Sequence, residues 1–140
     1  MSFHTRIKVR FGDADPAGWA YYPVIFHYFH VAMEEFFEAC CGISYQRMLA
    51  EERLGLPTVK VQAEFFSPLA YGDEVDIEVR VSRVGRSSVT LDYGARRAGD
   101  EQLCARSSQV HVAIDMNTRR PVPLPEKYRR ALEREKEDRD

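Results

Sequence analysis

Two carboxylates in a short loop are the residues of this chain whose types and spacing best suit chemistry. Asp13 and Asp15 stand in the segment 12–18, which also holds two glycines and a proline and cannot form a regular element. The loop runs into an apolar stretch with helical spacing. Free N–H groups and the positive dipole end at a helix N-terminus stabilise negative charge, such as an oxyanion on a substrate carbonyl. A carboxylate beside that carbonyl can attack it or deprotonate a water.

The same loop has a purely structural interpretation. An aspartate in a segment rich in glycine and proline, placed before a helix, is more often a turn former or an N-cap than a catalytic group. Spacing alone therefore favours the structural role for both aspartates, and it identifies no reaction. The residues indicate a plausible site here, but another observation is needed to choose between the two interpretations.

The loop is held between a strand and a long helix. Residues 3–11 alternate apolar and polar side chains, which is typical of a half-buried strand. Over residues 22–41 apolar and aromatic side chains recur at steps of three and four, which predicts a helix, and Pro23 suits its first turn. Few positions of this helix are polar, so we expect it to be central and covered on several sides. A second, shorter helix is expected from the N-cap Ser44 to Leu54.

The rest of the chain is expected to form strands and a tail. Alternating patterns predict strands over residues 59–65, 75–81, 89–95 and 102–114, and the short turns between them favour an antiparallel sheet. The apolar phase of the last strand changes along its length, so we expect a bulge or bend near 107–109. The long helix is the element able to cover the apolar face of the sheet. The fold class is therefore α+β, with an antiparallel five-stranded sheet wrapped around a long central helix.

Length and composition further limit the number of domains, the possible partners and the location. A chain of 140 residues can bury a core without metals or crosslinks, and we expect a single domain over 1–140 in which 126–140 form a charged helix or tail. The net charge of −2 does not indicate a nucleic-acid partner, and no stretch approaches the ~20 apolar residues of a membrane span. The N-terminus reads as a strand and not as a signal peptide, so a cytoplasmic location is expected. Three cysteines, two of them adjacent, are expected to be free thiols.

A resemblance to a known family makes these observations specific. The segment 10–18, RFGDADPAG, followed by Tyr21-Tyr22-Pro23 and an aromatic-rich helix, closely resembles the signature of the 4-hydroxybenzoyl-CoA thioesterase family. The likeness extends over nearly the whole chain, because the order of the strands and the place of the long helix also agree. It implies the hot-dog fold and an acyl-CoA thioesterase.

The resemblance also implies roles for single residues. Asp15 matches the catalytic aspartate of the family, and the backbone amide of Tyr22 matches its oxyanion donor. Asp13 resembles a residue that shapes the loop, and Gly18, which closes the motif, is assigned to substrate binding. His30 matches the position where the hydroxybenzoyl branch has an acid. We therefore expect His30 to line the acyl pocket, and the acyl group to be another aromatic acid or a short to medium aliphatic chain.

The turn between the second and third of the strands after the helices is a second candidate. Its candidate residues are Arg83, Arg86, Ser87 and Ser88. Arginine forks and hydroxyls beside a glycine turn can bind phosphate oxygens, and the plain alternative is a charged hairpin. In hot-dog thioesterases this region often meets the nucleotide end of coenzyme A. A metal held by His27 and His30 would need further ligands, so no metal is expected.

We therefore expect an acyl-CoA thioesterase that uses no cofactor, since coenzyme A is part of the substrate. The resemblance further implies a homodimer in which two subunits join their sheets and form two active sites at the interface, and dimers that can pair into a homotetramer. Two alternatives stay open: a thioesterase that acts on acyl carrier protein, and a non-catalytic acyl-CoA binding protein.

Overall fold

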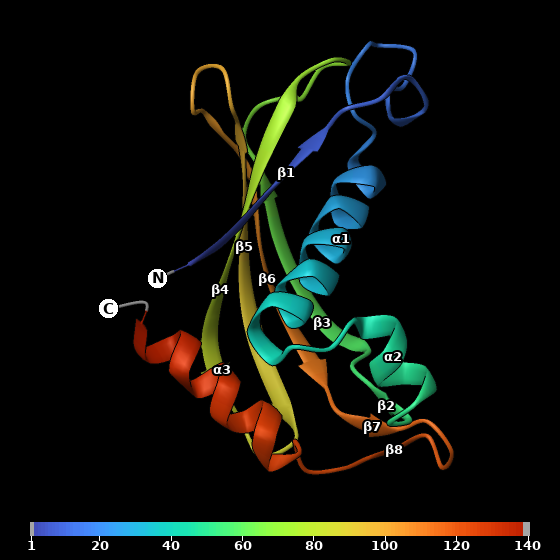
Figure 1. The fold of residues 1–140 in the computed structure, drawn as a ribbon. Coiled ribbons are helices and arrows are strands. Elements are labelled where there is room, and N and C mark those ends of the chain that lie inside the picture. The colour runs from blue at the N-terminus through green and yellow to red at the C-terminus, as the bar shows by residue number, and fades with distance from the viewer. Residues whose placement is uncertain (1, 139–140) are drawn as a thin grey trace.

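A five-stranded antiparallel sheet is the main element of the structure, a computed structural model that describes residues 2–138 (Figure 1). The strands stand in the order β1-β4-β5-β6-β3, and every neighbouring pair is antiparallel. The strands are β1 Phe3–Lys8, β3 Thr58–Phe65, β4 Glu74–Val84, β5 Ser88–Arg97 and β6 Leu103–Val112. The two edges of the sheet are therefore β1 and β3.

Three helices accompany the sheet. They are α1 Tyr22–Cys41, α2 Tyr45–Ala50 and α3 Glu126–Asp138. In Figure 1, α1 lies across one face of the sheet, and α3 packs against β4 and α1. The predicted charged helix at the C-terminus is present as α3, and it buries one apolar side that holds Tyr128 and Leu132. The end of the predicted tail, 139–140, lies outside the described residues.

The core fills the space between α1 and the sheet. The buried residues of α1 recur at steps of three and four and are Ile25, Tyr28, Phe29, Ala32, Met33, Phe36 and Phe37. The buried residues of β4 and β5 alternate along each strand and are Val75, Ile77, Val79, Val81, Val89, Leu91, Tyr93 and Ala95. These are the two periodicities that the sequence displays. The α+β class and the antiparallel five-stranded sheet around a long helix are confirmed.

The helix α1 is covered on fewer sides than its sequence indicates. Tyr22 is 58% exposed, Phe26 is half-buried and His30 is exposed, and these three residues lie four apart along one side of the helix. The rings of Tyr22 and Phe26 both meet the ring of Phe65 on the edge strand β3. The expectation of a helix wrapped on several sides is therefore wrong on this side, because aromatic residues also line the part that stays open.

The second helix is shorter than expected. Ser44 is its N-cap, as predicted, and its hydroxyl accepts a hydrogen bond from the Arg47 N–H at 3.2 Å. The helix ends at Ala50, and Arg53 then takes a left-handed conformation with φ 53°. This turn lets the chain enter a second, small sheet that the sequence does not indicate. Its strands are β2 Leu54–Gly55, β7 Ile114–Asp115 and β8 Arg120–Pro121.

The bulge predicted at Ser107–Gln109 is wrong. These residues pair regularly with β5, and the register shifts instead between Ala95 and Arg96, where Cys104 is the extra residue of β6. The prediction assumed that the apolar side chains of β6 always face the core. In the structure the buried positions of this strand after the bulge are largely polar, and its valines point to the opposite face.

The polar side chains buried on β6 form hydrogen bonds within the core. The Ser107 hydroxyl donates to the Gln62 carbonyl at 2.9 Å and accepts from the Gln109 side chain. His111 lies between the Thr58 hydroxyl and the Tyr93 hydroxyl, each 3.0 Å from one of its ring nitrogens. Because each buried polar group has a partner, the strand can turn a polar face toward α1 without a large desolvation cost.

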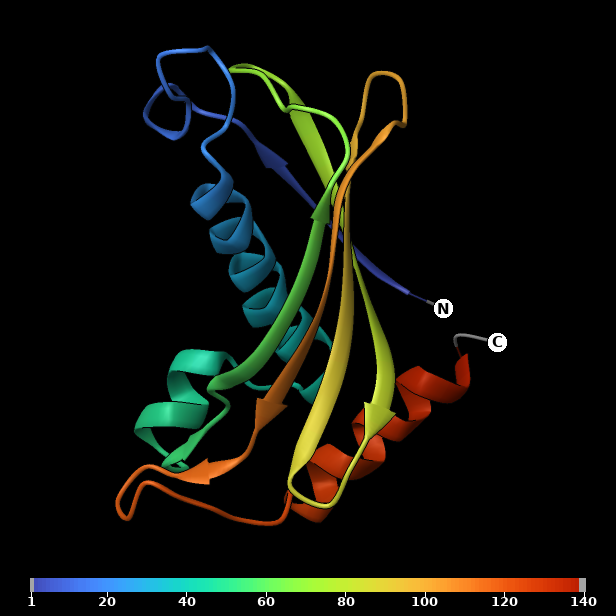
Figure 2. The same ribbon diagram turned by 180° about the vertical axis from the view of Figure 1, so that it is seen from behind.

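The two ends of the sheet carry different elements (Figure 2). One end, called here the Asp15 end, gathers the segment before α1, the connection between β3 and β4, and the β5–β6 turn. The other end, called the Arg86 end, gathers the β4–β5 turn, the small sheet and the start of α3. Within residues 2–138, no helix is long and apolar enough to cross a membrane.

Candidate active site

Asp13 builds the loop that precedes α1. Its carboxylate accepts hydrogen bonds from the Arg10 N–H at 2.9 Å and from the Tyr28 hydroxyl at 2.7 Å. Its backbone carbonyl accepts from the Tyr21 N–H at 3.0 Å. Burial and the adjacent Asp13 carboxylate raise the pKa of Tyr28, so this hydroxyl remains a donor. Asp13 therefore ties the loop to the helix, which agrees with the loop-shaping role expected for it.

Asp15 has one free carboxylate oxygen. Its Oδ1 accepts a hydrogen bond from the Ala17 N–H at 2.9 Å, and its backbone is fixed by Trp19 and Gly18. Gly18 sits at φ 88°, a left-handed conformation that suits glycine and closes the turn. Within the described part of the chain, the Oδ2 atom of Asp15 accepts no hydrogen bond. The side chain is thus held on one oxygen and available for chemistry on the other.

The start of α1 offers an unpaired donor. Tyr21 is the N-cap but its side chain makes no capping hydrogen bond, and Pro23 has no N–H to offer. Among residues 2–138, no acceptor receives the Tyr22 N–H. This N–H stands at the positive end of a helix of 20 residues, where an added negative charge is favoured.

One pocket at the Asp15 end brings these groups together. It has a volume of about 460 Å³. Its lining residues are Asp15, Trp19, Ala20, Tyr21, Tyr22, Ile25 and the run from Phe65 to Leu69. The wall is mostly apolar and aromatic, and its polar groups include one carboxylate, the helix start and the hydroxyls of Ser67, Tyr21 and Tyr22. A planar or aliphatic acyl group fits such a wall, and a carbonyl between Asp15 and Tyr22 would meet both a nucleophile or base and an oxyanion donor.

A larger hollow lies on the polar outer face of the sheet. Its volume is about 630 Å³, and its lining includes Ser82, Asp92, Glu64 and Arg106. The Glu64 carboxylate there is already paired with Arg106, at 2.6 Å between Oε1 and Nη2. The described residues that line this hollow all belong to strands, whereas the start of α1 lines the smaller pocket. The smaller pocket is therefore the candidate active site despite its size.

His30 lies away from this pocket. It stands eight residues after Tyr22, so about 12 Å further along α1, and its Nε2 is 2.9 Å from Glu34. His27 is exposed and does not line the pocket either. Among the described residues, no group of three or more His, Cys, Asp or Glu side chains could hold a metal ion. Gly18 shapes the loop but does not line the pocket, so its assignment to substrate binding stays a prediction.

The predicted phosphate-binding turn lies at the Arg86 end, across the length of the sheet from Asp15 (Figure 1). The turn is held by α3, since the Arg129 guanidinium donates to the carbonyls of Gly85 and Arg86 at 2.9 and 2.7 Å. The side chains of Arg83 and Arg86 are exposed, and Ser87 and Ser88 are half-buried. Within one chain, the structure does not bring these four candidates to the Asp15 pocket.

Several residues of the pocket wall were missed by reasoning from the sequence. Trp19 and Ser67 are two of them. Trp19 is part of the wall because its backbone pairs with Ala70, the residue after the lining run from Phe65 to Leu69. Its place directly after the motif was the available signal, and nothing local marks Ser67.

Comparison with known proteins gives a family and close structural neighbours. The family described as the thioesterase-like superfamily matches residues 9–132 of the chain. A 1,4-dihydroxy-2-naphthoyl-CoA hydrolase of Prochlorococcus marinus is 33% identical over 135 residues, which cover 91% of this chain and 87% of the relative. The enzyme of the same name from Synechococcus elongatus is 30% identical over 120 residues, which cover 85% of this chain and 86% of the relative.

Solved structures agree with these relatives. A 1,4-dihydroxy-2-naphthoyl-CoA thioesterase from Synechocystis superposes with a TM-score of 0.85 at 26% identity, over 94% of this chain and 96% of that one. The 4-hydroxybenzoyl CoA thioesterase from Pseudomonas sp. superposes with the same TM-score and identity, over 93% of this chain and 98% of that one. An aspartate-to-asparagine mutant of a 4-hydroxybenzoyl CoA thioesterase, complexed with 4-hydroxybenzoyl CoA, matches equally well, over 94% of this chain and 98% of that one.

Proposed function

The chain belongs to the thioesterase-like superfamily and is an acyl-CoA thioester hydrolase of the hot-dog fold, and from this premise we propose that Asp15 and the Tyr22 N–H carry out the hydrolysis. The observation that carries the proposal is that both groups line one pocket. The free Oδ2 of Asp15 and the unpaired N–H of Tyr22 both belong to a wall that is mostly apolar.

In the proposed reaction the thioester carbonyl oxygen accepts a hydrogen bond from the Tyr22 N–H, which stabilises the oxyanion that forms when the carbonyl carbon is attacked. Asp15 either attacks this carbon itself or takes a proton from an attacking water. Collapse of the tetrahedral intermediate breaks the carbon–sulfur bond, and coenzyme A leaves as a thiol after protonation. In the covalent route water then cleaves the acyl-aspartate. Both routes consume one water and yield one carboxylic acid.

The acyl group is proposed to be aromatic. Trp19, Tyr22, Phe65 and Phe66 surround the pocket, and aromatic rings pack well against such walls. The relatives that are named 1,4-dihydroxy-2-naphthoyl-CoA hydrolases support a bicyclic, hydroxylated acyl group as the first candidate. A short to medium aliphatic chain is the second candidate, since the wall is apolar enough to accept it.

A second subunit is proposed to complete the site. The edge strand β3 exposes apolar side chains, with Val61 45% and Phe65 46% exposed, and within residues 2–138 no strand pairs with its outer side. Exposed apolar edges of this kind favour pairing with another chain. A two-fold axis beside β3 would extend the sheet across both subunits and cover the open side of α1, with Phe26 and His30 facing the partner. His30 would then reach the acyl group of a shared site.

The same two-fold axis gives the turn 83–88 a role. Antiparallel pairing of the two β3 strands reverses one subunit against the other, so the Arg86 end of the second subunit lies beside the Asp15 end of the first. Arg83, Arg86, Ser87 and Ser88 of the second subunit are then proposed to hold the phosphates of coenzyme A. Size-exclusion chromatography with light scattering should show a dimer or tetramer, and Val61→Lys on the β3 edge should shift it toward monomer and lower activity together.

No metal or prosthetic group is proposed, because a carboxylate and a helix amide suffice for this hydrolysis. Activity should therefore survive dialysis against a chelator. The cytoplasmic location and the homotetramer stay predictions.

The test is the release of free thiol from a panel of acyl-CoA esters. The panel runs from 1,4-dihydroxy-2-naphthoyl-CoA, 4-hydroxybenzoyl-CoA and benzoyl-CoA to hexanoyl-CoA and palmitoyl-CoA. We expect the aromatic esters to be cleaved with the highest kcat/KM and palmitoyl-CoA with the lowest. Release from no coenzyme A ester would contradict the proposal and direct the search to acyl groups on acyl carrier protein or to a binding role.

A further inference from the structure

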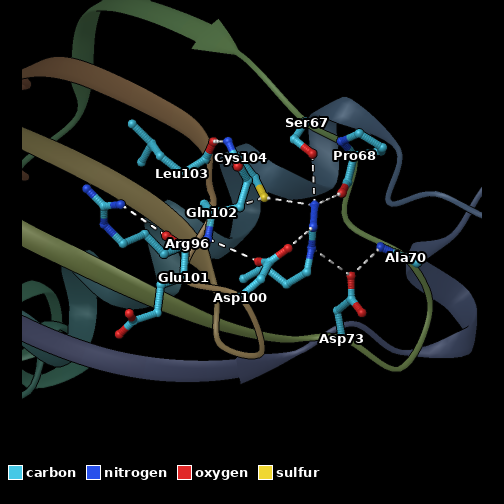
Figure 3. Close-up of polar contacts among 11 residues, drawn as sticks. Ser67, Pro68, Ala70, Asp73, Arg96, Asp100, Glu101, Gln102, Leu103 and Cys104 are labelled. Carbon is cyan, nitrogen blue, oxygen red and sulfur yellow. Dashed lines mark hydrogen bonds and ion pairs between the residues drawn. The ribbon is translucent and has the colours of Figure 1, made fainter.

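Arg97 joins three segments at the Asp15 end of the sheet, and Figure 3 labels its partners Ser67, Pro68, Asp73 and Asp100. It lies at the end of β5, and its guanidinium donates to the Ser67 hydroxyl at 2.8 Å and to the Pro68 carbonyl at 2.9 Å. The same group is paired with Asp100 in the β5–β6 turn at 2.8 Å, and its Nε lies 3.6 Å from Asp73. Only 23% of the side chain is exposed.

The segment that Arg97 holds is the wall of the candidate active site. Ser67 and Pro68 line the pocket together with Asp15 and Trp19. Arg97 therefore bonds residues of the wall without lining the pocket itself.

The wall is in turn bonded to the loop that carries Asp15. The Leu69 carbonyl accepts from the Ala20 N–H at 2.6 Å, and Ala70 pairs with Trp19 as an isolated bridge. Asp73 supports this contact, because its carboxylate accepts from the Ala70 N–H at 2.8 Å while it also faces Arg97. An unbroken line of bonds thus runs from the Arg97 guanidinium through residues 67–70 to the backbone at 19–20.

The chemistry of the guanidinium suits this position. Its planar fork donates in several fixed directions at once, so one side chain can bond a hydroxyl, a carbonyl and a carboxylate on separate segments. A lysine would keep the charge but could not reproduce the fork. Asp100, and more weakly Asp73, raise the pKa of Arg97, so the group stays charged throughout.

We propose that Arg97 is a positioning residue of the thioesterase reaction: it fixes the wall at Ser67–Pro68 and, through it, the loop that aims Asp15 at the carbonyl. The proposal rests on the proposed function for its effect on turnover. Its effect on the loop does not need substrate, which allows the two to be tested separately.

The experiment uses Trp19 as a probe, since it is the single tryptophan of the chain and stands in the loop. Quenching of its fluorescence by acrylamide is measured without substrate in the wild type, Arg97→Gln, Arg97→Lys and the matched control Arg129→Gln. Arg129 is the counterpart of Arg97 at the Arg86 end, because it is also 23% exposed and also bonds backbone carbonyls. We expect Trp19 to become more accessible in both Arg97 variants and to be unchanged in Arg129→Gln.

Steady-state kinetics on the best acyl-CoA gives the second readout. Misplacement of a catalytic group by about an ångström can cost up to about a hundredfold in rate, so we expect kcat to fall about tenfold to a hundredfold in Arg97→Gln, with KM little changed. In Arg129→Gln the change should appear in KM instead. An Arg97→Gln variant with wild-type kcat, or equal changes of Trp19 quenching in the Arg97 and Arg129 variants, would overturn the proposal.

Ser67→Ala is a milder variant that tests the same contact in case Arg97→Gln does not fold. It removes one contact of Arg97 and leaves the charge and the other partners in place. We expect a smaller fall in kcat in the same direction, and unchanged kcat in both Ser67→Ala and Arg97→Lys would overturn the proposal. If the wild type cleaves no acyl-CoA, the proposed function fails, while the Trp19 measurement still decides whether Arg97 fixes the loop.

Discussion

At each end of the sheet one arginine bonds a neighbouring segment. The two ends differ in whether that segment lines a pocket with groups available to a substrate. At the Asp15 end, Arg97 bonds the wall at Ser67 and Pro68. At the Arg86 end, Arg129 bonds the carbonyls of Gly85 and Arg86. Both side chains are 23% exposed. The anchoring is alike, but the Asp15 end also encloses an aromatic pocket that contains a carboxylate and a helix N-terminus.

Under the proposed function, the Asp15 end is the catalytic end and the Arg86 end is the binding end. The turn 83–88 contains no carboxylate, and its exposed arginines are suited to hold phosphate but not to cleave a thioester. The Asp15 end keeps one carboxylate oxygen and one helix N–H without a protein partner among the described residues. Groups left unpaired in this way are available to substrate, so changes at the Asp15 end should act on kcat and changes at the Arg86 end on KM.

Apart from the loss of Asp15 itself, the largest effect on kcat is expected from removal of the Tyr22 N–H. Tyr22→Pro removes this donor at the first helical position, where proline is tolerated, and Tyr21 already has the extended conformation that precedes a proline. We expect kcat to fall about 10²- to 10³-fold, the usual cost of one oxyanion donor. Tyr22→Phe keeps the N–H and should retain most of the activity. Equal kcat in Tyr22→Pro and Tyr22→Phe would remove this N–H from the mechanism.

A smaller effect, on the free energy of unfolding, is expected from His111 in the core between the two ends. Burial lowers the pKa of His111 from 6.5 to about 4, with Tyr93 and Thr58 at its ring nitrogens and His30 nearby. Between pH 6.5 and 4, His111 binds a proton in the unfolded chain but stays neutral in the folded chain. The free energy of unfolding is therefore highest above pH 6.5 and decreases as the pH falls toward 4. The loss amounts to about 3 kcal/mol.

Urea unfolding between pH 7.5 and 4 measures this loss. His111→Gln serves as the control, because it removes the titrating group and should flatten the pH dependence in this window. The same slope in the wild type and in His111→Gln would assign the acid sensitivity to other groups.

The smallest effect is expected at the Arg86 end. The double variant Arg83→Ala plus Arg86→Ala removes two candidate phosphate contacts, each worth about 1 kcal/mol or less where solvent screens it. We expect KM for acyl-CoA to rise about tenfold and to depend less on salt, with kcat unchanged. A fall in kcat without a change in KM would contradict the division between the two ends. A selective loss on acyl carrier protein substrates would indicate that carrier.

The parts of the fold that repeat a local pattern could be predicted from the sequence. The alternation along β4 and β5 and the helical spacing of α1 each reflect burial of one side of one element. The loop with Asp13 and Asp15 was also found, because a family motif marks it. The loop-shaping role of Asp13 followed from the resemblance, and its contacts agree with it. The catalytic role of Asp15 stays a prediction.

Features that depend on distant partners could not be predicted. Ser107 and His111 are polar but buried, since they bond residues of β3 and β5, and Gln109 bonds the Ser107 hydroxyl on its own strand. Arg97 bonds Pro68 and Ser67, which lie 29 and 30 positions earlier in the chain. From the sequence it could not be distinguished from an ordinary charged residue before a turn. Short strands such as β2 and β7 carry no periodicity at all, because each has two residues.

The measurement that tests the account most directly is thiol release from the best acyl-CoA by Asp15→Asn, with Asp13→Asn as the control from the same loop. Asp15→Asn is expected to lose kcat about 10³-fold while its unfolding temperature stays that of the wild type. Asp13→Asn should unfold at a lower temperature, because Asp13 ties the loop to α1, and should keep most of its turnover. Turnover at the wild-type rate by Asp15→Asn would contradict the account.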